Sequence, residues 1–152
     1  MKGLKPYRPT VEVRHLGKVA AGRVGSVVYD HIETRKIPDD IANGYDPDDL
    51  FTLDVTGDSM TDSDAKFEVL CGSTVVVHSG LEPRPGHIVS VWLIEEDLGV
   101  LKKYRTMDGH VVLESYNREH KPIVINEETP AIMQGVVIGQ WKPMNLNASN
   151  GR

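Results

Sequence analysis

The sequence predicts a mainly β domain, folded as a curled sheet or a partly open barrel. From Leu50 onward, short β-branched runs follow one another, and turns rich in Gly, Pro, Asp and Asn separate them. Helical periodicity is almost absent from the same region. We therefore expect one β-rich domain over residues 50–143, an extended N-terminal arm over residues 1–49 and a flexible polar tail over residues 144–152.

The expected strands can be given in chain order. They are LFTLDV, STVVVH, HIVSVWL, GVLKKYR, HVVLES, PIVIN and AIMQGVVIGQW. Turn sequences, among them EPRPG and MDG, lie between them. The last run is the longest of them.

The first 49 residues have a different character. TVEVRHL alternates weakly, as a short edge strand does, and RVGSVVYDHI is a second extended segment. IPDDIANGYDPDD is acidic and rich in turn residues. Because this region does not contain two successive amphipathic helices, it does not encode a helix-turn-helix.

Composition excludes several classes of function. The 152 residues carry a net charge of −5, which argues against the chain gripping DNA by itself. Cys71 is the one cysteine, so neither an internal disulfide framework nor a Cys-rich zinc site is expected. No apolar run reaches the length of a membrane span, and MKGLKPYRP lacks the apolar part of a secretory signal. We expect a cytoplasmic protein without a metal or cofactor.

A candidate nucleophile follows the first strand of the β-rich region. In TGDSM, Ser59 lies at a strand-to-turn transition, where a hydroxyl can be exposed beside backbone amides that point the same way. The structural alternative is an ordinary Gly-Asp-Ser turn. A nucleophilic serine also needs a base, and none of the six histidines has the spacing of a triad or metal motif.

The strand GVLKKYR offers a lysine as the base. Alternation places Val100, Lys102 and Tyr104 on one face of the strand, and Lys103 on the other face. Lys102 is therefore the lysine that burial can hold neutral, as a general base requires. The alternative is that Lys102 extends its charged end to solvent from an edge strand.

Three pieces of the chain occur in a distinctive order: VAAG, with Ala21 and Gly22; GDSM, with Ser59; and VLKKY, with Lys102. In this order the chain resembles the LexA/UmuD/phage-repressor family of self-cleaving serine–lysine proteases, over about residues 15–143. HVVLESYNREHKPIVIN and the closing AIMQGVVIGQW resemble later parts of the same family.

The resemblance implies a role for each matched residue. Ser59 is the expected nucleophile and Lys102 the expected general base. The scissile bond is expected between Ala21 and Gly22, within KVAAGRVG, and the backbone amides of Asp58 and Ser59 are expected to form the oxyanion hole. The fold implied is the curled, partly open barrel of the LexA-like autoprotease domain, which requires no cofactor.

Two departures from the family leave the biological role open. The loop TDSDAKFEVL after Met60 is long, and Cys71 to Ser73 occupy the turn that follows it. Only 21 residues precede the expected scissile bond, where LexA and phage repressors carry a DNA-binding domain. The resemblance thus allows the autoprotease domain of a repressor in the DNA-damage (SOS) response, or a UmuD-like accessory subunit of a translesion DNA polymerase.

The family also implies partners. We expect a homodimer, stimulation by the RecA–single-stranded DNA filament, and contact with DNA only through a DNA-binding domain that this chain does not contain. A non-catalytic dimerisation module is the alternative of another class. A peptidase acting on other chains, as bacterial signal peptidases do, is disfavoured because no membrane anchor is apparent.

Overall fold

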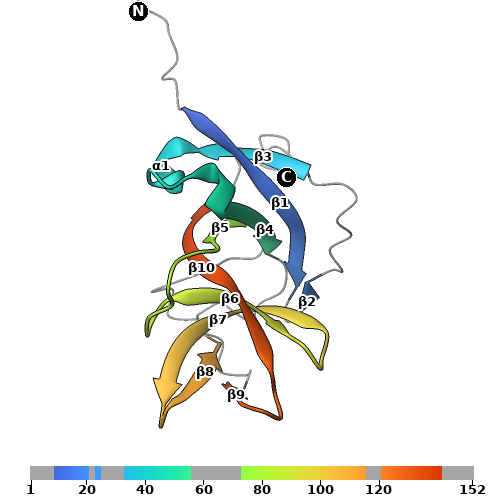
Figure 1. Cartoon of the computed structure of the whole chain (residues 1–152). Helices are drawn as coiled ribbons and strands as arrows, with labels where there is room; N and C mark the ends of the chain where they lie inside the picture. Colours follow the sequence, from blue (N-terminus) through green and yellow to red (C-terminus); the bar gives the residue numbers. More distant parts are fainter. Residues whose placement is uncertain (1–8, 21–22, 25–32, 56–72, 116–120, 142–152) are drawn as a thin grey trace, which may run out of the picture.

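A computed structural model of the chain describes residues 9–20, 23–24, 33–55, 73–115 and 121–141 (Figure 1). Most of these residues lie in strands. The elements are β1 (Thr10–Ala20), β2 (Arg23–Val24), β3 (Glu33–Pro38), α1 (Asp39–Ala42), the 3₁₀ turn η1 (Pro47–Asp49), β4 (Leu50–Val55), β5 (Thr74–His78), β6 (Ile88–Leu93), β7 (Leu98–Met107), β8 (His110–Glu114), β9 (Ile123–Ile125) and β10 (Ala131–Trp141). None of the described helices is long and apolar enough to cross a membrane.

The strands form one large sheet that does not close into a barrel. Its order is β2-β1-β4-β5-β10-β6-β7-β8-β9, and β3 pairs with β1 outside this path. β1 and β4 are parallel, whereas the other described pairs are antiparallel. The predicted fold class, a mainly β curled sheet, is confirmed, and each of the seven strands expected after Leu50 is present.

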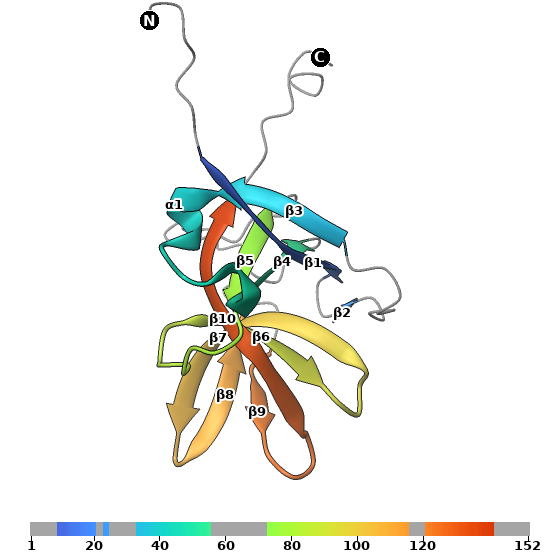
Figure 2. The same ribbon diagram turned by 45° about the horizontal axis from the view of Figure 1, so that its top comes forward.

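β10 joins the two halves of the sheet (Figure 2). Its first part, from Ala131 to Val136, pairs with β6, and its second part, from Val136 to Trp141, pairs with β5. The register shifts twice along the strand, between Met133 and Gly135 and between Val137 and Gly139. Such irregularities bend a strand and increase its twist, so β10 can follow both halves of the curled sheet.

The core consists of three apolar clusters. One lies where β4 and β5 meet β6 and β7, and includes Phe51, Leu53, Val75, Val77 and Leu101. A second joins β6, β7, β8 and β10, and includes Val89, Val91, Val100, Leu113 and Val136. A third lies under α1 and β3, and includes Val13, Ile37, Ala42, Leu50 and Val76.

The expectation that TVEVRHL is an edge strand is wrong. β1 pairs with β3 along Thr10 to His15 and with β4 between Arg14 and Val19. The alternation looked weak because the buried face of β1 carries His15 beside Val13. Histidine is counted as a polar residue in a sequence pattern, so its burial was not expected. Its burial requires polar partners, which come from β4. The division of the chain at residue 50 stays a prediction.

The MDG turn between β7 and β8 fixes the register of these strands. Asp108 and Gly109 connect the paired residues Met107 and His110, and both have positive φ, 52° and 81°. Two left-handed residues in a two-residue loop are typical of a type I′ hairpin, for which Asp-Gly is a favoured sequence. This turn therefore determines which residue of β8 lies opposite each residue of β7.

Gly135 is expected to be intolerant of a side chain. A Cβ atom on Gly135 would lie 2.5 Å from the carbonyl oxygen of His78 and 2.6 Å from Cγ1 of Val77. We expect Gly135→Ala to lower the free energy of unfolding by about 2 kcal/mol, because the backbone of β5 would have to move to make room for the methyl group. Urea denaturation measures this loss. Gly139→Ala is the matched control: its Cβ would meet a side-chain methyl of Ile41 at 2.9 Å, so we expect a smaller loss. Equal losses would contradict this explanation.

Candidate active site

Lys102 lies in the middle of β7, on the face predicted from alternation. Its cross-strand neighbour on β6 is Val89, and Val100 and Tyr104 belong to the same apolar cluster as Val89. Leu101, one residue away, packs into the other cluster. The side chain of Lys102 is buried, with 5% of the residue exposed, so it does not extend to solvent.

The environment of Lys102 disfavours a charged side chain. Burial lowers the pKa of its ammonium group from the ordinary value of 10.5. Its Nζ atom donates a hydrogen bond to Oγ of Ser115, at 2.6 Å. Lys103 lies on the opposite face of the strand, at the register position facing Glu114. The structure therefore distinguishes the two adjacent lysines in the way that the sequence predicts.

The expected cleavage segment begins at the end of β1. β1 and β2 pair as a hairpin, in which Val19 faces Val24 and Ala20 faces Arg23. The two connecting residues, Ala21 and Gly22, lie outside the described part of the chain. Both β1 and β2 have Cα atoms within 8 Å of β7, the strand that carries Lys102. Figure 1 shows β2 beside the end of the sheet where β6 and β7 meet.

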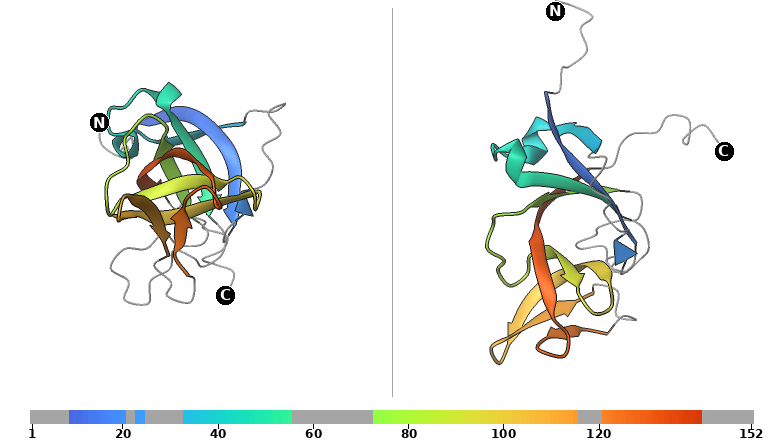
Figure 3. Two further views of the ribbon diagram at one scale, coloured as in Figure 1. Left: turned by 60° about the horizontal axis from the view of Figure 1, so that its bottom comes forward. Right: turned by 45° about the vertical axis from the view of Figure 1, so that its right-hand side comes forward.

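The segment that carries Ser59 follows β4 in the chain, and β4 ends beside the end of β1. Lys18 pairs with Asp54 and Val19 with Val55, in the parallel ladder of β1 and β4 (Figure 3). Ser59 follows Val55 by four residues, which limits their separation to about 14 Å. Ala21 follows Val19 by two residues, which limits it to about 7 Å. Asp58 and Ser59 lie outside the described residues, so the approach of the predicted nucleophile to the predicted bond stays a prediction.

A partly buried polar cluster that includes residues of β1 and β4 was not predicted. Asp54 is its centre: Oδ1 accepts hydrogen bonds from Arg35 at 2.6 Å and from Thr74 at 2.9 Å. His15 places Nε2 3.5 Å from Oδ2 of Asp54, and its Nδ1 lies 2.8 Å from Oγ1 of Thr52. The cluster ties together β1, β3, β4 and β5. The polar residues Thr52 and Asp54 within the apolar run LFTLDV were the one sequence signal for it.

Electrostatics keeps this cluster in a defined charge state. Burial alone would raise the pKa of Asp54, but the hydrogen bonds from Arg35 and Thr74, with the charges of His15 and Arg35, hold it below its usual value. Burial, and then the charge of Arg35, lower the pKa of His15 below 6.5. His15 is thus a buried structural histidine. The described residues contain no group of three His, Cys, Asp or Glu side chains able to hold a metal ion.

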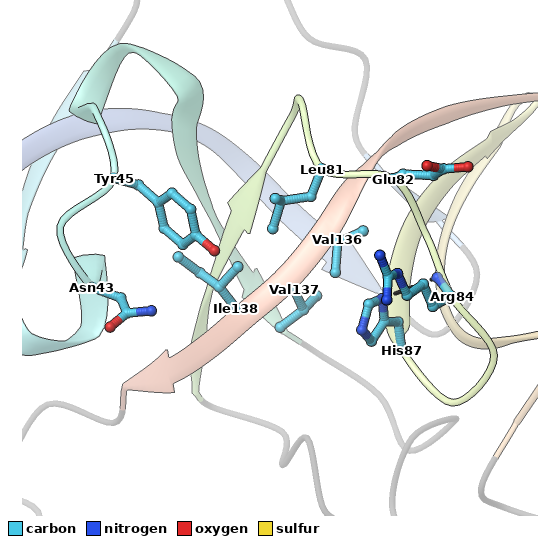
Figure 4. Close-up of a pocket in the computed structure, with 9 residues that line it drawn as sticks. All are labelled: Asn43, Tyr45, Leu81, Glu82, Arg84, His87, Val136, Val137 and Ile138. Carbon is cyan, nitrogen blue, oxygen red and sulfur yellow. Dashed lines mark hydrogen bonds between the residues drawn. The ribbon is translucent and has the colours of Figure 1, made fainter.

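A hollow of about 510 Å³ lies elsewhere on the molecule, over β10 (Figure 4). Val136, Val137 and Ile138 line it from β10, and Tyr45 and Arg84 line it from neighbouring loops. Lys102, the predicted catalytic residue that the structure describes, does not line this hollow. The backbone N–H of Arg84 donates to Nδ1 of His87 at 3.1 Å, which shapes the loop at its rim.

The mainly β fold and the buried lysine agree with the class of serine peptidase that the sequence resembles. A protein-family model described as Peptidase S24-like matches residues 14–138. This range covers most of the chain and includes all of the predicted site residues. The protein belongs to the Peptidase S24-like family, the LexA/UmuD-like family of serine peptidases, as the sequence motifs predicted.

Proposed function

We propose that this protein is an autoprotease that uses Ser59 as nucleophile and Lys102 as general base to cut its own Ala21–Gly22 bond. The observation that carries the proposal is the burial of Lys102 on an apolar face of β7. A lysine exposed to water is charged at neutral pH and has no lone pair to accept a proton. Burial lowers its pKa and so makes the neutral base available.

The proposed reaction has two stages. Neutral Lys102 accepts the proton of the Ser59 hydroxyl as Oγ attacks the carbonyl carbon of Ala21, and the backbone amides of Asp58 and Ser59 stabilise the oxyanion. Protonated Lys102 then gives the proton to the amine of Gly22 as the peptide bond breaks. Water hydrolyses the resulting ester between Ser59 and Ala21, which releases the new carboxyl end and restores the serine.

The hairpin of β1 and β2 supports the proposed substrate. β1 and β2, which flank the proposed bond, both have Cα atoms within 8 Å of β7, and an intramolecular encounter has a low entropic cost. Small residues at the bond, Ala20, Ala21 and Gly22, allow close approach of the backbone to a serine and a lysine. Control must then act on docking of this segment or on the charge of Lys102.

Alkaline incubation of the full chain tests the proposal. We expect fragments 1–21 and 22–152 by mass spectrometry, formed at a rate that rises with pH. Because protonated Lys102 is inactive, the rate should rise about tenfold per pH unit below the folded pKa of Lys102 and level off above it. Ser59→Ala should give a folded, uncleaved chain. A rate that is flat or falls from neutral to alkaline pH, with the fold intact, would exclude a lysine base.

For the biological role, we propose the autoprotease domain of a LexA- or phage-type repressor in the SOS response, cleaved with the help of the RecA filament. The UmuD-like accessory role at a translesion polymerase is the alternative, and a non-catalytic dimerisation module is the alternative of another class. Adding activated RecA to the incubation tests the non-catalytic alternative, because a dimerisation module gives no fragments under any condition. A helix-turn-helix encoded ahead of Met1 would favour the repressor.

We further propose that the chain acts as a homodimer. Ile132 and Met133 of β10 are exposed, at 55% and 37%, and offer apolar contact area. Both residues lie in the part of β10 that pairs with β6, and their exposed side chains would form the contact. Sedimentation of Ile132→Lys beside the wild type measures whether this surface takes part.

A further inference from the structure

We infer that Ser115 is a positioning residue for Lys102: its hydroxyl oxygen accepts a hydrogen bond from Nζ and so fixes the orientation of the amine. This inference rests on the proposed function, to which it adds a third side chain. It starts from the 2.6 Å hydrogen bond between Lys102 Nζ and Ser115 Oγ. Sequence reasoning did not single out Ser115, because nothing in HVVLES marks a serine at the end of a strand.

The fold determines the position of Ser115. In the β7–β8 ladder, Tyr104 faces Leu113 and Lys103 faces Glu114. Ser115 directly follows Glu114, the last residue of β8, and so continues this register opposite Lys102. The type I′ turn at Asp108 and Gly109 sets this register. The contact therefore depends on the register of the β7–β8 hairpin.

A neutral lysine needs such a contact to act as a base. The amine of Lys102 lies at the end of a flexible four-carbon side chain. Apolar neighbours such as Val89 and Val100 bury the side chain but offer no hydrogen-bond acceptor that would fix the rotation about Cε–Nζ. Donation of one N–H to Ser115 fixes this rotation and therefore the direction of the lone pair. After proton transfer the ammonium group has three N–H donors, so one can stay on Ser115 while another serves the leaving amine.

Few charged groups compete for Lys102 among the residues that the structure describes. On β8, Glu114 is opposite Lys103 and forms an ion pair with Arg105, on the other face of the sheet. Tyr104 is the titratable residue that shares the face of Lys102 on β7. Of the other elements near β7, β6 carries no charged or titratable residue. The charged or titratable residues of β1 and β2 are Glu12, Arg14, His15 and Lys18 of β1 and Arg23 of β2.

The test compares Ser115→Ala, Ser115→Thr and Ser90→Ala with the wild-type chain. Ser90 is the matched control: it is buried on β6 opposite Leu101, and its Oγ donates to Gln134 at 2.7 Å. Ser90→Ala therefore removes a serine hydrogen bond of similar burial but leaves the hydrogen bond of Lys102 intact. Self-cleavage is followed by intact mass from pH 7 to pH 11, and the fold of each variant is checked by circular dichroism.

We expect Ser115→Ala to lower the rate at the alkaline plateau by about 10- to 100-fold, because the amine is no longer oriented. We also expect the midpoint of its pH profile to fall by about one unit, because Ser115 no longer accepts from the charged ammonium, which that bond favours. Ser115→Thr should recover most of the rate, and Ser90→Ala should follow the wild type. A merely structural role would slow cleavage equally in both serine-to-alanine variants and leave the midpoint unchanged.

A second measurement does not require cleavage. In a Ser59→Ala chain labelled with ¹³C at lysine Cε, NMR titration reports the pKa of Lys102, whose signal is identified by its loss in Lys102→Met. Adding Ser115→Ala should lower that pKa; an unchanged pKa would overturn the inference whether or not the chain cleaves. If Ser115→Ala cleaves itself at the wild-type rate, the inference about Ser115 is overturned and the proposed function stands. If the wild-type chain does not cleave itself, the proposed function is refuted.

Covalent labelling tests the division of roles between the two serines. An alkyl fluorophosphonate is expected to modify Ser59, mapped by peptide mass spectrometry. Labelling of Ser115 instead would make Ser115 the nucleophile and overturn its assignment as a positioning residue.

Discussion

Lys102→Met is expected to abolish self-cleavage and, at the same time, to stabilise the fold. The rate of cleavage should fall by at least about 10²- to 10⁴-fold, because the variant has no general base to accept the proton of Ser59. The free energy of unfolding at pH 7 should rise by about 1–3 kcal/mol, because an apolar side chain of similar length replaces a buried amine in the cluster of Val89 and Val100.

The pH dependence of this stabilisation follows from the lowered pKa of Lys102. A group whose folded pKa is depressed destabilises the fold most at pH values below that folded pKa, where the buried ammonium must be accommodated. The advantage of Lys102→Met should therefore be largest near neutral pH and shrink as pH rises toward 10.5. Urea denaturation at pH 7, 8.5 and 10 measures it.

Lys103→Met is the matched control for both effects. Lys103 lies on the opposite face of β7 and is less buried, so the variant should cleave itself at close to the wild-type rate and gain little stability. Loss of cleavage in Lys103→Met with retention in Lys102→Met would reverse the assignment of the base.

Asp54→Ala is expected to cost about 2–4 kcal/mol of unfolding free energy. The variant removes the acceptor shared by Arg35 and Thr74 and leaves the buried His15 without its carboxylate. Arg35 is partly exposed and can turn to water, so most of the cost comes from Thr74 and His15. Since β1 runs from His15 directly to the expected cleavage segment, self-cleavage should slow as well.

Two comparisons make the Asp54 prediction specific. Asp54→Asn keeps the shape of the side chain and should cost less than Asp54→Ala, whereas Glu96→Gln, at an exposed position, should change stability by no more than about 0.5 kcal/mol. The contribution of Asp54 is present above its unfolded pKa of about 3.9 and is lost as pH falls through its lower folded value. The wild type and Asp54→Asn should therefore converge below pH 4 in urea denaturation. A difference that persists there would show that packing, not charge, carries the effect.

The lowered pKa of His15 also makes the fold less stable as pH falls, but over a higher pH range than Asp54 does. Its contribution is present above the unfolded pKa of 6.5 and is lost as pH falls through the lower folded value, because the unfolded chain takes up the proton first. Both groups therefore make the pairing of β1 with β4 weaker in acid, in the same range where Lys102 is charged.

Much of the fold was predictable because it depends on local pattern. The strands after Leu50 appear as β-branched runs between turn residues, and alternation along GVLKKYR was enough to choose Lys102 over Lys103 as the buried lysine. The Asp-Gly turn of the β7–β8 hairpin is equally local, because its positive φ angles are properties of those two residues. The family was identified from the order of three short motifs and is confirmed by the match over residues 14–138.

What the sequence by itself determined, then, is the fold class, the family and the lysine to examine, because periodicity, turn chemistry and motif order are written in neighbouring residues. Only the tertiary structure decided that β1 pairs on both sides, that Asp54 gathers His15, Arg35 and Thr74, and that Ser115 meets Lys102. These contacts join residues 13 to 39 positions apart along the chain, and their partners are chosen by sheet order and register. Register is a property of paired strands, so the alternation of any single strand does not contain it.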